Sequence, residues 1–176
     1  MAIQEKVATH LEELHGSDFE LAGGQPDITG WDIVTRSGKK AGDVEDLLFD
    51  PDTNKVRYII ADLDKNELGL DDERKVLIPI GLAELYTKSK KTHQGHRMDP
   101  AFSAYDPAEH GNIVFIPTIS AKQLDALPLY EKGHLSRHTE IAIRRIMEPA
   151  DRNGHEEDEF YRHRHFDEDR FYDRGN

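Results

Sequence analysis

Six short β-rich segments joined by tight turns fill the middle of the chain and restrict it to a small β architecture. Aliphatic, β-branched and aromatic residues dominate these segments, which cover 31–35, 41–50, 56–63, 75–80, 83–87 and 112–117. Gly38 suits a turn after the first segment, and Pro51 and Asn54 suit the turn after the second. Because no long helical pattern separates the segments, we expect a mainly β fold, a small antiparallel six-stranded barrel with short flanking helices.

A helical pattern precedes the β-rich segments. One apolar stripe with helical spacing runs through Ile3, Val7, Leu11 and Leu14. The stripe stops before Gly16, and a Gly-Gly-Gln-Pro linker follows. The pattern therefore predicts a short amphipathic helix, which has to dock on the domain because a helix this short is marginal alone.

Two further helices are predicted after the strands. Ser120 and Gln123 form a capping box that begins a short helix, and residues 136–147 have helical periodicity. The chain then divides into an N-terminal helix and linker at 1–26, a barrel domain at 27–130 with a long loop at 88–111, a C-terminal helix at 131–148, and a charged aromatic tail at 149–176.

Composition excludes several classes of function. The 176 residues carry a formal net charge of −12, which opposes binding to phosphate backbones or anionic lipid, so nucleic acid is not an expected partner. The chain has no cysteine, which excludes disulfides, thiol catalysis and Cys-ligated metals. No apolar run approaches the roughly 18 residues of a membrane span, and no signal-peptide pattern begins the sequence. We expect a cytoplasmic protein without a membrane span.

The sequence contains none of the usual enzymatic motifs. There is no Gly-x-Ser-x-Gly elbow, no phosphate-binding or dinucleotide-binding glycine loop and no His-Glu-x-x-His helix. We therefore expect a protein that is not an enzyme, with no catalytic residues and no bound cofactor.

Three groups of polar residues are candidate metal sites. One is the pair His93 and His96 in the long loop, with Asp99 and His110 beyond it. In the tail, His163 and His165 alternate with Asp167 and Asp169, and these nitrogen and oxygen atoms suit zinc or nickel. The acidic segment that begins at Asp62 resembles a calcium loop. It lacks the glycine of the sharp turn, however, and is interpreted as a solvated loop between two strands.

The tail is also rich in aromatic residues, which a purely solvated segment would not contain. These candidate interaction residues are Phe160, Tyr161, Phe166, Phe171 and Tyr172. We expect part of the tail to pack on the barrel or on a second copy of the chain.

Four runs across two hairpins resemble the PRC-barrel family. They are GWDIV at 30–34, GKKAGDVEDLLFD at 38–50, NKVRYIIAD at 54–62 and RKVLIPIG at 74–81. The family is named for the cytoplasmic domain of the photosynthetic reaction-centre H subunit and includes a domain of the ribosome-maturation protein RimM. The resemblance implies a PRC-type β-barrel of the stand-alone bacterial form that serves assembly or docking rather than chemistry.

Within such a barrel, the apolar strand residues are interpreted as core or rim. The expected core residues are Trp31, Tyr58, Ile60, Val76 and Ile78. Gly38 and Gly42 are interpreted as turn and close-packing positions. Since a small barrel fills its interior with side chains, any ligand has to bind outside it or in the long loop.

The leading hypothesis is a non-enzymatic interaction or assembly module whose partner is a second copy, in a homodimer, or another protein. One alternative is a metal-binding protein that uses the His, Asp and Glu clusters of the loop and tail. A second alternative is an RNA- or ribosome-associated factor by analogy with RimM, which the negative charge opposes.

Overall fold

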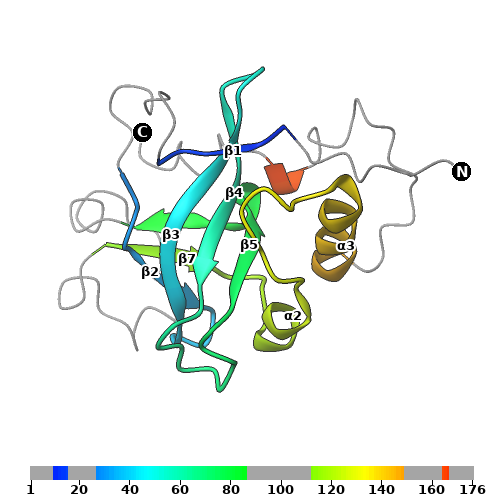
Figure 1. Cartoon of the computed structure of the whole chain (residues 1–176). Helices are drawn as coiled ribbons and strands as arrows, with labels where there is room; N and C mark the ends of the chain where they lie inside the picture. Colours follow the sequence, from blue (N-terminus) through cyan, green and yellow to red (C-terminus); the bar gives the residue numbers. More distant parts are fainter. Residues whose placement is uncertain (1–9, 16–26, 87–111, 149–163, 167–176) are drawn as a thin grey trace, which may run out of the picture.

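The computed structural model describes residues 10–15, 27–86, 112–148 and 164–166 (Figure 1). Its strands are β1 (Glu12–Glu13), β2 (Asp32–Thr35), β3 (Lys40–Asp50), β4 (Lys55–Asp62), β5 (Lys75–Pro79), β6 (Glu84–Tyr86) and β7 (Ile113–Ile116). Its helices are α2 (Ala121–Ala126) and α3 (Arg137–Met147), with short 3-10 turns η1 (Ile80–Leu82) and η5 (Arg164–Phe166). Within these ranges no helix is long and apolar enough to cross a bilayer.

The strands form one sheet in the order β5-β4-β3-β2-β7-β6, with β1 added to β3. The mainly β class and all six predicted strands are confirmed, but the sheet has seven strands and is mixed. β2 and β7 run parallel, in register from Asp32↔Ile113 to Thr35↔Ile116. β5 and β6 end the sheet and do not pair with each other, so the sheet of the expected barrel is not closed. They are joined by η1, so one bent stretch of chain pairs with β4 and then with β7.

The β3–β4 hairpin forms the centre of the sheet. Asn54 adopts a φ of 57° in its turn, as the sequence predicted for this position, and its N–H donates to the carbonyl of Asp50 at 2.7 Å. At the other end of β3, a Cβ built on Gly42 would lie 2.1 Å from the carbonyl oxygen of Asp62. Gly42 is therefore a close-packing position, because only a residue without a side chain lets β4 approach this far.

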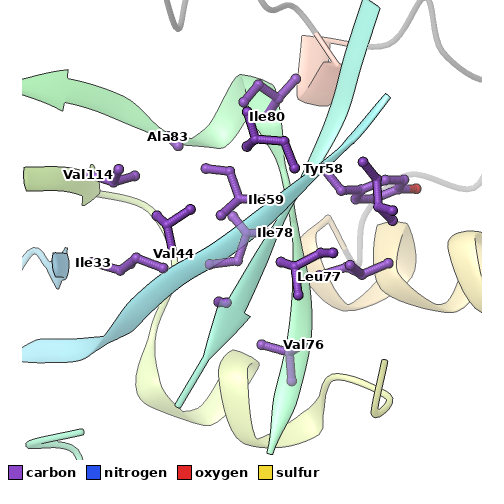
Figure 2. Close-up of a cluster of buried hydrophobic side chains, with 14 of the residues drawn as sticks. Ile33, Val44, Tyr58, Ile59, Val76, Leu77, Ile78, Ile80, Ala83 and Val114 are labelled. Atoms are coloured by element: carbon purple, nitrogen blue, oxygen red, sulfur yellow. The ribbon is translucent and has the colours of Figure 1, made fainter. Parts of the chain in front are cut away.

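Strands β4 and β5 are buried on both faces. Ile59 pairs with Ile78, and their side chains point into the barrel together with Ile33, Val44 and Val114 (Figure 2). Tyr58 and Leu77 point the opposite way, toward the helices. Of the five predicted core residues, Tyr58, Ile60, Val76 and Ile78 are at most 1% exposed, and Trp31 is half-buried against the core.

The helices cover the outer face of β4 and β5 (Figure 1). Ser120 caps α2 with the predicted reciprocal capping box, and Ser136 caps α3 by accepting a hydrogen bond from the N–H of Thr139. Between the helices, the N–H of Tyr130 donates to the carbonyl of Lys75 at 2.8 Å. This segment therefore pairs with part of the otherwise open edge of β5.

The predicted N-terminal helix is wrong for residues 10–15. These residues include β1, an extended pair antiparallel to the end of β3, and the N–H of Leu14 donates to the carbonyl of Leu47 at 2.9 Å. The end of β3 extends beyond β2 and presents peptide groups that an extended neighbour can pair with, whereas a helix would pair only with itself. Leu14 is buried, so the apolar stripe is used for packing. The remainder of the predicted helix lies outside the described residues.

The packing of β4 predicts a large cost for emptying one of its buried sites. Ile60→Ala should lower the free energy of unfolding by roughly 2–5 kcal/mol, because Ile60 is 1% exposed and lies on the face covered by the helices. Chemical denaturation measures the loss, with Leu129→Ala at a 57% exposed site as the control. A loss below about 1 kcal/mol at Ile60 would contradict the burial of this face.

Two glycine substitutions distinguish the stability cost of close packing from the stability cost of backbone strain. Gly30 and Gly42 both have positive φ angles, but a Cβ on Gly30 meets nothing within 4 Å. Gly42→Ala should therefore cost roughly 1–3 kcal/mol more than Gly30→Ala, because only the former drives a methyl group into the β4 backbone. If thermal or chemical unfolding shows equal losses of stability for the two variants, β3 and β4 can move apart to accept the methyl group without a penalty.

Candidate functional site

The interior of the barrel is filled by its own side chains. Ile33, Ile59, Ile78 and Val114 are fully buried there and point toward one another (Figure 2). A hollow of about 90 Å³ lies between β5 and α3, lined in part by Leu77 and Ile143, and ordinary ligand pockets of roughly 300–1,000 Å³ are several times larger. The features that can bind a partner therefore have to be sought on the outside of the barrel.

One buried polar contact fixes α3 on the barrel. The hydroxyl of Tyr58 on β4 donates to Glu140 Oε1 on α3 at 3.0 Å, and both residues are 0% exposed. Arg137 Nη1 lies 3.3 Å from Glu140 Oε2. A carboxylate removed from water needs such donors, so the position of α3 is set by the phenol and the guanidinium together.

The short turn η5 docks beside this contact. The ring of Phe166 is 4% exposed and meets the ring of Tyr58 edge to face, with centroids 5.2 Å apart and an interplanar angle of 80°. His165 is 1% exposed, and its Nε2 lies 3.4 Å from Glu148 Oε2 at the end of α3. η5 also neighbours η1. We name the surface formed by Tyr58, η1 and Glu148 the tail pocket.

The tail pocket contains two of the residues singled out from the sequence. Phe166, one of five candidate interaction residues, packs on the barrel, and His165, one of four candidate metal ligands, faces Glu148. The other candidates lie outside the described residues: Phe160, Tyr161, His163, Asp167, Asp169, Phe171 and Tyr172. The metal site and the wider docking of the tail therefore stay predictions, as does any role of the loop at 88–111. Sequence patterns did not point to Glu140, because its partner Tyr58 is 82 positions away.

A second group of polar residues lies around β1, in a groove of about 570 Å³. Glu13 accepts a hydrogen bond from the hydroxyl of Tyr130 at 2.8 Å and lies 3.0 Å from Lys132 Nζ. His15 Nδ1 lies 2.9 Å from Asp46 Oδ1, and the His15 N–H also donates to that carboxylate. Burial and then the hydrogen bond to Glu13 raise the pKa of Tyr130 well above its usual value. The groove therefore contains a protonated phenol and paired charges, which hold the N-terminal strand in place.

Beyond β1, His10 lies near two aspartates of the β3–β4 turn. Its Nε2 lies 3.0 Å from Asp50 Oδ1 and 3.7 Å from Asp52 Oδ2, an arrangement whose atoms could hold a metal ion. Arg57 Nη2, however, already lies 3.6 Å from the other Asp50 oxygen. Burial raises the pKa of Asp50, but hydrogen bonds from the Asp52 N–H and from His10 outweigh it and hold that pKa below its usual value. We assign this cluster to holding residue 10 against β3.

The calcium-like loop after Asp62 is organised by its own asparagine. The Asn66 carboxamide donates to the carbonyls of Leu63 at 2.9 Å and Leu70 at 3.0 Å. The carboxylate of Glu67, which replaces the expected glycine, accepts a hydrogen bond from the N–H of Lys40 at 2.8 Å. Both side chains therefore serve the structure of the loop and its contact with β3.

The His15–Asp46 pair predicts a stability that depends on pH. The hydrogen bond and charge of Asp46 raise the pKa of His15 above 6.5. Because the folded pKa exceeds the unfolded value, the contribution of the pair is fully present below about pH 6.5 and is lost as the pH rises through the folded pKa. Denaturation between about pH 5 and pH 9 should show this loss in the native protein but not in His15→Gln.

The control for this titration is Asp46→Asn, which removes the charge beside His15 and keeps a similar shape. In an NMR titration of the folded protein, His15 should titrate at a lower pH in this variant than in the native chain. An unchanged His15 titration would show that Asp46 does not hold the histidine in solution.

A comparison with protein families agrees with this geometry. Residues 24–95 match the sequence model of the PRC-barrel domain, a range that contains β2 to β6, Gly42 and Tyr58. No curated protein sequence matches the chain significantly. The β3–β4 hairpin and the turn from β5 into β6 thus belong to a known domain type, and residues 24–95 of the chain are a PRC-barrel domain.

Proposed function

We propose that the protein is a non-enzymatic interaction module that binds protein segments on the outside of its barrel and self-associates. The observation that carries the proposal is the tail pocket, where a segment remote in sequence is buried against the outer face of β4. Aromatic side chains that fill preformed pockets supply much of the binding energy in protein interfaces. A PRC-barrel domain is typically non-catalytic, which supports the same reading.

The chemistry of the described grooves also favours binding over catalysis. A general base needs a pKa near the working pH and a free lone pair aimed at a substrate. Tyr130 instead has a raised pKa and donates a hydrogen bond to Glu13, and the Asp46 carboxylate accepts one from His15. These groups are engaged with one another in holding β1 to the barrel.

Metal binding by the tail is the alternative proposal. His165 already contacts Glu148, so a metal at His163, His165, Asp167 and Asp169 would compete with the docking of η5. Elemental analysis of untagged protein tests this alternative. A role in binding RNA is opposed by the net charge of −12.

The main proposal predicts a reversible dimer. Sedimentation velocity at protein concentrations from about 1 μM to about 1 mM should show a 20.1 kDa species converting to one of twice that mass. The dimer should survive high salt, because apolar contacts are screened far less than surface ion pairs. A species that stays at 20.1 kDa over the whole range would remove self-association from the proposal.

A further inference from the structure

The tail pocket is built by parts of the chain that are fixed without the tail. Tyr58 is held by its pairing with Pro79 in β5 and by the hydrogen bond to Glu140. α3 begins at its Ser136 cap, and Glu148 stands at its C-terminal end. None of these contacts uses a residue of η5, so each of them can form without η5.

The docked segment is short. Among the described residues, η5 contains two buried side chains, His165 and Phe166. Residues 149–163 link η5 to α3, and a chain of this length spans at most about 50 Å. The pocket and the segment therefore relate to each other as a binding site and a tethered ligand.

We propose that the tail pocket is a peptide-recognition site whose ligand is an aromatic turn, and that the chain's own His165-Phe166 turn occupies it as a built-in competitor. This inference rests on the proposed function and names the site and its ligand class. A partner that binds there has to displace η5. Because η5 belongs to the same chain as the pocket, the tail excludes weak ligands and yields only to tight or abundant ones.

The chemistry of the pocket defines what such a ligand needs. The face of Tyr58 receives the edge of an aromatic ring, as it does from Phe166. Glu148 lies 3.4 Å from the imidazole of His165, so it favours a donor or a cation at the residue before the ring. The ligand class is therefore a peptide in which a donor residue immediately precedes an aromatic one.

The test adds the turn as a separate peptide to the full-length chain. The probe is a fluorescent peptide with the sequence of residues 158–172, and the receptor is the full-length Phe166→Ala variant, whose own turn lacks the ring. The peptide should bind this variant saturably, and bind the native chain at least roughly tenfold more weakly because the native turn competes. The same peptide with Phe166→Ala is the matched control and should not bind.

A second variant tests whether binding occurs at this pocket. Adding Glu148→Gln to the receptor should weaken binding of the peptide while leaving the far-ultraviolet circular dichroism unchanged. If the folded Phe166→Ala chain binds neither peptide, or binds both equally, the recognition site is overturned. Binding that Glu148→Gln leaves unchanged would also overturn it, since the peptide would then occupy another surface.

Cross-linking of a nearly native chain gives an independent measurement that does not depend on the folding of Phe166→Ala. Because the protein has no cysteine, Glu148→Cys and His165→Cys can be placed in one chain or in two separate chains. A short bismaleimide should join the two positions within the double variant, and should join the two single variants in a mixture only at high protein concentration. Failure to cross-link within the double variant would overturn the docked turn itself.

These experiments separate the inference from the proposed function. A reversible dimer without binding of the trans peptide would overturn the aromatic-turn site and leave the interaction module in place. Binding of the peptide by a chain that remains monomeric would support the site and remove self-association from the proposed function.

Discussion

The hydrogen bond between Tyr58 and Glu140 is the contact on which the outer layer of the molecule depends. It joins β4 to α3 across 82 positions of sequence, with both side chains fully buried. In such surroundings a carboxylate without donors is costly, so α3 has few alternative positions that would keep Glu140 satisfied. The same tyrosine presents its ring to Phe166, so η5 packs against the side chain that also holds α3.

The barrel supplies the rigid support for this layer. Ile59 and Ile78 fill the interior from adjacent strands, and their neighbours in sequence, Tyr58 and Leu77, face the helices. The alternation of side chains along a β-strand thus divides one hydrophobic run between the barrel interior and the face covered by the helices. A protein built this way has little room for a ligand inside, and its binding surfaces lie where the outer layer meets the barrel.

Local signals made much of the fold predictable. The Ser120 capping box, the Asn54 turn and the strand segments are each determined by residues a few positions apart, and each was found where the sequence placed it. The close approach at Gly42 was likewise expected, although the partner that requires it, the Asp62 carbonyl, becomes evident only from the pairing of β3 with β4.

Contacts that depend on distant partners were not predictable from local patterns. The parallel pairing of β2 with β7 joins segments separated by most of the domain, and periodicity carries no information on strand direction. The stripe through Leu11 and Leu14 fits a helix, but the open end of β3 and the anchors Asp46 and Asp50 favour an extended chain. Histidines 31 and 40 positions from their aspartates carry no spacing signal.

The aromatic tail illustrates why a docked segment can still be exchangeable. Burying one phenylalanine contributes about 1.5–3 kcal/mol, and its edge-to-face contact with Tyr58 adds about 0.5–1.5 kcal/mol. Ordering the three residues of η5 opposes this with about 1–2 kcal/mol for each. The two sums nearly cancel, so the remaining contact between His165 and Glu148 and the short tether decide whether the turn stays bound. A sufficiently tight or abundant competing peptide can therefore displace this turn and change the occupancy of the tail pocket.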